Sequence, residues 1–388
     1  MSRGRIVDDR GYTLLTGVTG LLGRYLYRDL VSQGVPLAVL VRPKGRESAE
    51  DRVEALAAWW EANLGRPLAR PVCLEGDVTQ PGLGLSAEAK HWVASNCGRV
   101  VHSAASLVFH GGDRTREPWL SSYNGTRNLV ELCKSVGIGE LHHTSTAYVC
   151  GTRDGTICES DLNVGQGFRN DYEECKCTAE AWLRDQGGLD SLTVYRPAVI
   201  VGDSETGHTT TYLGVYRFFQ FAWLLAQQAP RGADGRCILP IRLRMTGEEC
   251  QNLVPVDWVS AVMARLITSP EAQGRTYHLT PAVPTRSSQI EAALADYFSF
   301  RGVSFAGSDG APDETLNEPE RLFYDYIDAH EDYLRAEPVF DARNTLAAAP
   351  DLPCPEVDAP CLRRLIDFAV HDRWGRSASV SARRKQRQ

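Results

Sequence analysis

The first 200 residues alternate between short apolar runs and longer mixed segments. The apolar runs are rich in β-branched residues and predict strands at residues 12–16, 37–41, 71–75, 99–103, 140–144 and 191–195. The segments between them predict helices at residues 21–31, 48–64, 86–96 and 126–136. Strands that alternate with helices require a parallel sheet joined by right-handed crossovers.

After residue 197 this alternation gives way to helical segments. Helices are predicted at residues 212–227, 257–268, 321–337 and 362–368. The sequence therefore predicts an α/β fold, in which a Rossmann-type doubly wound parallel sheet is followed by a smaller, mostly helical C-terminal lobe.

The predicted domain boundary lies at residue 200. Residues 1–200 would form the sheet domain and residues 201–375 the second lobe, with segments near residues 250–280 returning to the sheet domain. Residues 376–388 hold five basic residues and no acid, without apolar periodicity. We expect a disordered basic tail there.

The composition narrows the class of protein further. The formal net charge of −7 gives no reason to expect a nucleic-acid partner. No run of 18 apolar residues is present, so no stable membrane insertion is expected. The eleven cysteines contain no pair of Cys-x-x-Cys motifs, which favours reduced thiols in a cytoplasmic protein without a metal site. The sequence leaves the oligomeric state open.

Three glycines follow the first predicted strand and open the first predicted helix. Gly17 permits a tight turn, Gly20 lets the backbone approach a pyrophosphate, and Gly23 lets helix and strand pack closely. The start of the helix then offers free N–H groups to phosphates. The pattern predicts a dinucleotide site formed by Gly17, Thr19, Gly20, Leu21, Leu22 and Gly23.

The end of the second predicted strand bears on the choice of nicotinamide cofactor. An NAD site places an acid there, about 20 residues after the loop, to hold the ribose hydroxyls. This chain has Arg42 instead, with Lys44 and Arg52 as further basic residues. Guanidinium groups suit a 2′-phosphate, so we expect NADPH, held by Arg42 and Arg52.

A tyrosine and a lysine four residues apart form a candidate acid–base pair. On a helix this spacing places Tyr172 and Lys176 on one face. A free phenol has a pKa near ~10, and a nearby ammonium would bring that pKa toward the working range. Upstream, a predicted buried strand ends in Thr144, Ser145 and Thr146. A hydroxyl at that point can hydrogen-bond a substrate carbonyl and stabilise developing negative charge.

In their order along the chain, the glycine loop, the hydroxyl residues and the Tyr/Lys pair resemble the pattern of the extended short-chain dehydrogenase/reductase superfamily. The resemblance covers residues 12–280. The resemblance implies that Thr146, counted back from Gly151, is the catalytic hydroxyl, with Ser145 as the alternative, and that Tyr172 and Lys176 are the catalytic pair. Beyond the loop, it implies cofactor contacts by Asp77, Val78, Ser103, Ala104, Ala105, Tyr172, Lys176 and Pro197.

Within that superfamily, several stretches are similar to the thioester reductase and fatty acyl-CoA reductase branch. They are residues 76–86, 196–207 and 252–259, together with Phe340, Asp341 and Asn344. One position departs from the family pattern. The family usually has asparagine three residues before the Gly125-Thr126 pair, and this chain has Ser122, which puts a role for that asparagine in doubt.

The branch implies reduction of an acyl thioester, bound to a carrier protein or to CoA. Hydride from NADPH would attack the carbonyl while Thr146 and Tyr172 hydrogen-bond its oxygen and Lys176 lowers the phenol pKa. The product would be an aldehyde, which a second hydride could carry on to the alcohol. The second lobe would form the acyl pocket from an aromatic set: Tyr212, Tyr216, Phe218, Phe219, Phe221 and Trp223.

Three other functions stay open at this stage. Two are enzymes of the same superfamily, a carbonyl reductase and a sugar-nucleotide epimerase or dehydratase. Epimerases favour an acid after the second strand, so Arg42 argues against them. The third is a non-catalytic NADPH-binding sensor, which would have no need of Tyr172 and Lys176.

Overall fold

A computed structural model describes residues 10–307, 309–327 and 337–376. The chain divides into two compact units. Unit 1 comprises Met1–Pro197, Val259–Leu279 and Phe340–Pro353, and unit 2 comprises Ala198–Trp258, Thr280–Val339 and Cys354–Gln388. The sequence-based division had put residues 340–353 in the second lobe, whereas in the structure they belong to the unit that holds the sheet.

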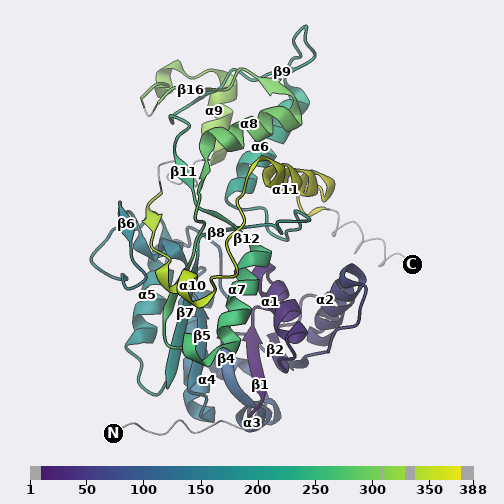
Figure 1. The fold of residues 1–388 in the computed structure, drawn as a ribbon, viewed down its shortest axis with the longest axis vertical. Coiled ribbons are helices and arrows are strands. Elements are labelled where there is room, and N and C mark those ends of the chain that lie inside the picture. Colours follow the sequence, from purple (N-terminus) through teal and green to yellow (C-terminus); the bar gives the residue numbers. More distant parts are fainter. Residues whose placement is uncertain (1–9, 308, 328–336, 377–388) are drawn as a thin grey trace. The chain divides into compact units, whose positions relative to one another are not determined.

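Unit 1 is built on a seven-stranded parallel sheet with the order β13-β7-β5-β4-β1-β2-β3 (Figure 1). The strands are β1 (Tyr12–Thr16), β2 (Leu37–Val41), β3 (Val72–Glu75), β4 (Cys97–His102), β5 (Glu140–Thr144), β7 (Ser191–Pro197) and β13 (Thr276–Leu279). This order confirms the predicted doubly wound sheet. Six strands lie where the apolar runs predicted them, and β13 is the strand that the pattern did not predict.

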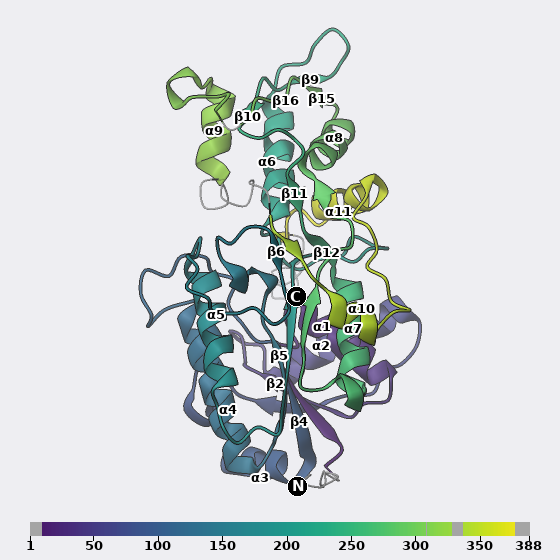
Figure 2. The ribbon, with the colours of Figure 1, turned by 60° about the vertical axis from the view of Figure 1, so that its left-hand side comes forward.

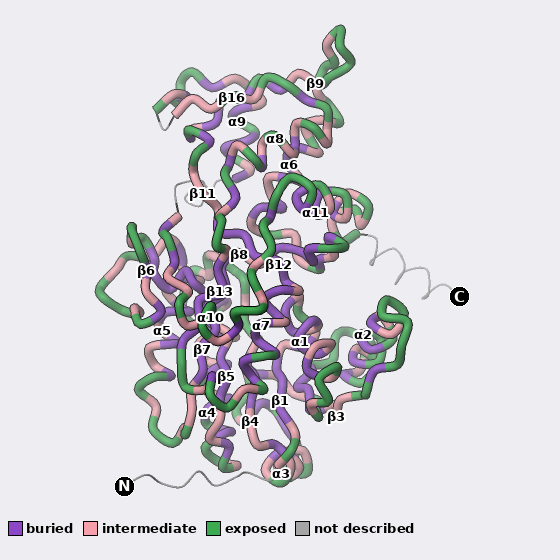
Figure 3. The backbone as a smooth tube through the Cα atoms, viewed as in Figure 1, coloured by how far each residue is buried: buried purple, intermediate pink, exposed green. Residues whose placement is uncertain are grey.

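Helices cover both faces of this sheet. Figure 2 shows α4 (Gly125–Val136) and α5 (Asp171–Arg184) on one face and α1 (Leu21–Ser32) and α7 (Val256–Thr268) on the other. Two more helices, α2 (Ala49–Leu64) and α3 (Ala87–Asn96), begin at serine caps, since the hydroxyls of Ser48 and Ser86 accept from backbone N–H groups three residues on. With helices on both faces, the inner strands are largely buried (Figure 3), whereas only Leu74 is buried in the edge strand β3.

The C-terminal segment of unit 1 supports the edge strand β13. The Asp341 N–H donates to the Ile157 carbonyl at 2.9 Å, and α10 (Arg343–Ala348) follows. The Asn344 side chain donates to the Thr276 carbonyl of β13 at 2.9 Å. Phe340, Asp341 and Asn344, which resembled a family element in the sequence, therefore belong to a segment that holds the end of the sheet.

Unit 2 has its own hydrophobic core between four helices and several two-stranded pairs. The helices are α6 (Val215–Gln228), α8 (Ser287–Phe298), α9 (Glu318–Ile327) and α11 (Ala359–His371). The longest strand pair joins β8 (Val199–Val201) to β12 (Leu253–Pro255) in parallel. α9 begins three residues before its predicted start, and residues 328–336 of the predicted helix lie outside the described residues.

Two further expectations can be compared with the structure only in part. Within the described residues, no helix is long and apolar enough to cross a membrane. Of the expected basic tail, only Arg376 is described, and residues 377–388 lie outside the described part of the chain.

Candidate active site

The site residues that the sequence predicted follow one after another along the carboxyl edge of the sheet. Asp77 follows β3, Arg42 follows β2, Gly17 follows β1 and Ser103 follows β4. Thr146 follows β5, while Pro197 ends β7. Because neighbouring strands lie about 4.8 Å apart, these six strand ends span five spacings, or roughly 24 Å. A row of this length at one edge suits an extended ligand such as a dinucleotide.

The glycine loop between β1 and α1 is a cradle in which side chains would clash. Gly17 has a φ of +78°, and a Cβ there would lie 2.7 Å from the backbone of Ser103 and Ala104. A Cβ on Gly23 would lie 2.0 Å from the Gly17 carbonyl oxygen. Gly20 is the N-cap of α1 and offers no side chain to its first N–H groups. The loop therefore fits a pyrophosphate at an uncapped helix N-terminus.

The other predicted loop residues are less exposed than the glycine at the cap. Leu22 is buried in unit 1, whereas Thr19 and Leu21 are half-buried at the start of the helix. Leu22 thus packs the helix against the sheet, and the surface offered to a ligand consists mainly of backbone.

A buried histidine ties the loop to the neighbouring strand. Thr126 uses its hydroxyl proton on the Ser122 carbonyl at 2.6 Å, so its oxygen accepts from His102 Nε2 at 3.1 Å. His102 Nδ1 then accepts from the Thr16 hydroxyl at 2.8 Å, and that oxygen accepts from Ala104 N–H at 3.2 Å. This network fits a neutral imidazole. Burial, together with the charge of Lys176, accordingly lowers the pKa of His102 to about 3.

Arg42 and Asp77 lie at one end of the row of strand ends, after β2 and β3. The Arg42 guanidinium reaches the Asp77 carboxylate at 3.3 Å, and its side chain is 64% exposed. Arg52 donates to the Arg42 carbonyl at 2.6 Å, which leaves Arg52 supporting the backbone of Arg42. Burial opposes the charge on Asp77, but hydrogen bonds from Thr79 and Arg42 outweigh it and lower the pKa of Asp77. Val78 is buried, and its carbonyl accepts from Asn128.

Tyr172 and Thr146 meet toward the other end of the row, after β5. α5 begins after Asn170, whose side chain accepts from the Glu173 N–H, so Tyr172 lies in the first turn and Lys176 one turn later. Burial raises the pKa of Tyr172 to about 12, and a hydrogen bond with the Thr146 side chain opposes that rise. The Thr146 hydroxyl also lies 3.4 Å from the Pro197 carbonyl, so α5, β5 and β7 converge here.

Lys176 is fully enclosed by unit 1 and donates to the Thr144 carbonyl at 2.7 Å. Burial lowers the pKa of Lys176 to about 8. In this structure the ammonium is thus held by the end of β5, one residue before Ser145, rather than by the phenol.

The two neighbouring hydroxyls, Ser145 and Thr146, have different partners. The Ser145 hydroxyl donates to the Glu180 carboxylate at 2.7 Å, while Thr146 lies with Tyr172. Glu180 is paired with Arg196 at 2.7 Å, and both side chains are completely buried. Of the two candidates, therefore, Thr146 accompanies the phenol and Ser145 belongs to a buried ionic network.

Sequence reasoning missed Glu180, although its spacing offered a signal. Tyr172, Lys176 and Glu180 are four residues apart in succession, which places all three on one face of α5. The spacing did not indicate the partner of Glu180, although Arg196 is the first residue of the stretch 196–207 that resembles the family.

Ser122, where the family usually has asparagine, lies in a π-helical turn (Leu120–Asn124) that leads into α4. Its side chain is buried, and its hydroxyl oxygen accepts from the Ser106 N–H at 3.1 Å. π-Turns are rare and frequently occur at functional sites. Here the turn holds the loop that follows β4, next to Ala104 and Ala105.

The strand order, the glycine cradle and the Tyr/Lys helix define a Rossmann protein of the extended short-chain dehydrogenase/reductase type. Residues 15–263 match the NAD-binding family model described as male sterility protein, and the chain belongs to this family. The family resemblance expected from the sequence is therefore confirmed.

Two relatives agree with this assignment. The chain is 29% identical over 304 residues to the nonribosomal peptide synthetase asaC of Aspergillus flavus, covering 72% of this chain and 27% of the relative. It is 26% identical over 226 residues to the fatty acyl-CoA reductase wat of Drosophila melanogaster, covering 50% and 43%. The chain thus spans less than half the length of each.

A crystal structure of the terminal R domain from the myxalamid PKS-NRPS biosynthetic pathway has a similar fold. Its TM-score is 0.74 at 24% identity, and the match covers 95% of this chain and 92% of that chain. At this identity, the likeness concerns the fold.

Proposed function

We propose that this chain is an NADPH-dependent reductase that converts an acyl thioester, bound to a carrier protein or to CoA, into an aldehyde. The observation that carries the proposal is the Thr146–Tyr172 pair at the end of β5, with Lys176 one helical turn further along α5. Hydroxyl groups at this point can bind a carbonyl oxygen and donate a proton to it. The fatty acyl-CoA reductase among the relatives supports a thioester as the substrate.

The proposed mechanism assigns a role to each of these side chains. NADPH, when bound, supplies the hydride. The hydroxyls of Thr146 and Tyr172 donate to the thioester oxygen as it becomes anionic, and Tyr172 transfers its proton to that oxygen. The resulting thiohemiacetal loses its thiol to give the aldehyde. Lys176 stabilises the phenolate left on Tyr172. Its ammonium, which donates to the Thr144 carbonyl in this structure, must then also act on that phenolate.

NADPH rather than NADH is proposed because of Arg42. Its guanidinium is largely exposed at the end of β2, where an NAD site would present an acid. A 2′-phosphate could accept from Arg42 in place of Asp77, and a charge-assisted hydrogen bond of this kind is strong. Arg42→Ala is therefore expected to raise the KM for NADPH by a much larger factor than the KM for NADH. The location of the protein in the cytoplasm stays a prediction.

The decisive experiment follows NADPH oxidation with four substrates in parallel: acyl-CoA, acyl-pantetheine, the matching aldehyde and a ketone. We expect oxidation with thioesters, and consumption of a second equivalent of NADPH if the aldehyde is reduced as well. Activity with ketones and none with thioesters or aldehydes would instead assign the chain to the carbonyl reductases.

A Tyr172→Phe variant serves as the control for this assay. It is expected to abolish turnover and to leave the affinity for NADPH largely intact, because the phenol acts on the substrate oxygen. Loss of NADPH binding in this variant would mean that the tyrosine has been given the wrong role.

A further inference from the structure

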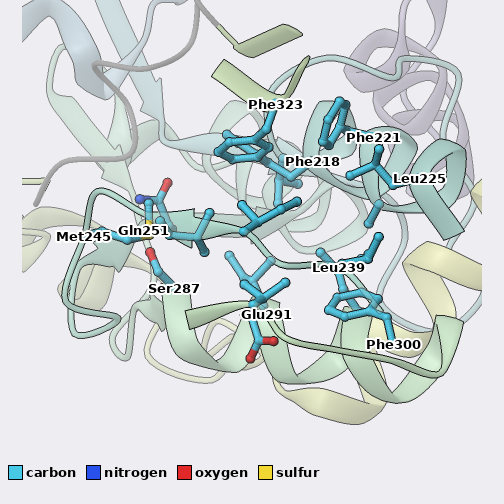
Figure 4. Close-up of a pocket in the computed structure, with 17 residues that line it drawn as sticks. Phe218, Phe221, Leu225, Leu239, Met245, Gln251, Ser287, Glu291, Phe300 and Phe323 are labelled. Carbon is cyan, nitrogen blue, oxygen red and sulfur yellow. The ribbon is translucent and has the colours of Figure 1, made fainter. Parts of the chain in front are cut away.

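An aromatic side chain from the loop that follows β4 packs on the candidate catalytic tyrosine. The rings of Phe109 and Tyr172 have centroids 6.0 Å apart and an interplanar angle of 37°. Aromatic rings attract each other at separations of about 4.5–7 Å. Phe218 and Phe221, two of the aromatic residues singled out from the sequence, line a pocket within the core of unit 2 (Figure 4). Phe109 was not among the residues singled out, although its ring meets the phenol.

The same loop is attached to the first turn of α5. The Gly111 N–H donates to the Asp171 carboxylate at 2.7 Å. The Arg114 guanidinium donates to the Glu174 carboxylate at 2.8 Å. Asp171 comes directly before Tyr172 and Glu174 two residues after it, so the loop is bonded to the helix on both sides of the tyrosine in the sequence.

The loop is also fixed at its start and within itself. The Ser106 N–H donates to the Ser122 hydroxyl at 3.1 Å. A Cβ on Gly111 would lie 1.9 Å from the carbonyl oxygen of the residue six positions further on, so the chain folds back here in a way that only glycine allows. Residues 105–116, here called the strap, are therefore held at Ser106 on one side of Phe109 and at Gly111 on the other.

The contacts of the strap add to a favourable position of the two acids. Asp171 and Glu174 lie in the first turn of α5, where a negative charge is stabilised by the helix dipole without any partner. Arg114 and Glu174 are 69% and 38% exposed, and an exposed ion pair of this kind contributes little stability. Loss of one contact is therefore expected to loosen the strap without unfolding unit 1.

We propose that Phe109 is a positioning residue for the Tyr172 phenol, and that the strap keeps its ring in place. Thr146 holds the phenol by a hydrogen bond, while Phe109 packs on its ring. The two contacts come from different elements and together fix where the proton is donated. A displacement of about 1 Å can lower a rate about a hundredfold. The inference rests on the proposed function for the role of Tyr172, and on the contacts of the strap for that of Phe109.

The first test compares Phe109→Ala with Val108→Ala, a change at its 44% exposed neighbour. Both are assayed with whichever of thioester, aldehyde or ketone the wild type reduces, and thermal unfolding verifies that they fold. Phe109→Ala should lower kcat at least about tenfold and change the KM for NADPH less than about twofold, because the glycine loop is untouched. Val108→Ala should keep kcat within about twofold of the wild type.

Phe109→Tyr separates positioning from a general loss of stability. It keeps the ring, so it should recover most of the rate that Phe109→Ala loses. A wild-type kcat in Phe109→Ala, or an equal loss in Val108→Ala, would overturn the role of Phe109.

The second test measures the attachment of the strap without any substrate. Arg116 provides the matched control for Arg114, because it is similarly exposed and pairs at 3.5 Å with Asp113 inside the strap. The readout is the hydrogen-exchange rate of the Gly111 N–H, followed by NMR after isotopic labelling of glycine. Arg114→Glu places a like charge beside Glu174 and should accelerate this exchange up to about fivefold.

The control and a charge swap complete the second test. Arg116→Glu should leave the exchange of the Gly111 N–H within about twofold of the wild type. Adding Glu174→Arg to Arg114→Glu should restore slow exchange, because the ion pair is re-formed with its charges reversed. Equal acceleration in the Arg114 and Arg116 variants, or none in Arg114→Glu, would overturn the attachment.

Failure of the positioning role and failure of the proposed function give different results. Reduction of a thioester with an unchanged kcat in Phe109→Ala would retain the reductase and reject the role of Phe109. Reduction of a ketone and of no thioester would reject the proposed function. The ratio of kcat between Phe109→Ala and the wild type, measured with that ketone, would then decide the role of Phe109.

Discussion

Ser145 and Thr146 show how strongly the partner of a side chain decides its role. They carry the same functional group and are adjacent in sequence, but successive residues of an extended chain point in opposite directions. One hydroxyl therefore meets Glu180 and the other meets Tyr172. Counting residues within a motif could favour Thr146 but could not show what Ser145 binds, because Glu180 lies 35 residues further along the chain.

This difference predicts distinct phenotypes for two alanine variants. Thr146→Ala should lower kcat/KM about a hundredfold, because it removes a donor to the developing oxyanion. It should also cost about 1 kcal/mol of stability, because the Thr146 hydroxyl accepts from the Tyr148 N–H at the start of a 3₁₀ turn. Ser145→Ala should lower the free energy of unfolding by about 1–3 kcal/mol, because the buried Glu180 carboxylate loses a donor. Steady-state kinetics and urea unfolding of both variants distinguish these effects. The reverse pattern would show that Ser145 is the catalytic hydroxyl.

At the level of secondary structure, α5 has two tasks on one face. It presents Tyr172 and Lys176 at the carboxyl edge of the sheet, and one turn later it buries Glu180 against Arg196 of β7. A charge pair without solvent exposure stabilises a fold only when both partners are present. We therefore expect the pair to fix where α5 lies on the sheet, with Glu180 as a positioning residue for Tyr172 and Lys176.

Glu180→Gln should show this positioning role. We expect a loss of about 3–5 kcal/mol in the free energy of unfolding, because Arg196 would keep a buried charge without its counterion. In the folded variant kcat should fall more than KM rises, because the catalytic pair moves while the rest of the substrate site remains.

Arg184→Gln provides the matched control for Glu180→Gln. Arg184 also contacts Glu180, but its side chain is 38% exposed, so we expect less than about 1 kcal/mol of lost stability. Similar losses in the two variants would mean that burial of the Glu180–Arg196 pair is not what positions the helix.

The predictability of the fold differs between its elements for a physical reason. β1, β2 and α2 were predicted almost residue by residue, since a buried strand and a serine-capped helix are encoded by their own sequences. β13 has only four residues and pairs with β7, about eighty residues earlier, so its place depends on the folded sheet. The strand ends that form the candidate site were predictable because each strand is encoded by its own sequence. The Glu180–Arg196 network was missed because it forms only once α5 lies on the folded sheet.

At the scale of the whole molecule, the sheet of unit 1 encloses four buried histidines. His102, His142, His143 and His278 each have an exposed fraction of 1% or less. The two ring nitrogens of His143 are among the described buried polar atoms without a hydrogen-bond partner. Burial is the largest cause of a lowered pKa in all four, with values of about 3 for His102 and about 4 for His278. In mild acid His102 and His278 are therefore neutral in the folded protein and become protonated when it unfolds.

This arrangement predicts that stability falls as the pH drops below 6.5. Well above 6.5 both states are neutral at His102 and His278, so these residues contribute no pH dependence there. Between 6.5 and about 4 the unfolded chain binds protons that the folded chain does not, and His102 and His278 each lower the free energy of unfolding by up to about 1.4 kcal/mol per pH unit. Urea unfolding followed across this range in wild type and His278→Gln should show a shallower slope in the variant, by roughly one histidine's share. An identical slope in the two proteins would mean that His278 already carries its proton in the folded state, and its hydrogen bonds to Arg196 and Asp341 would then have to be reassigned.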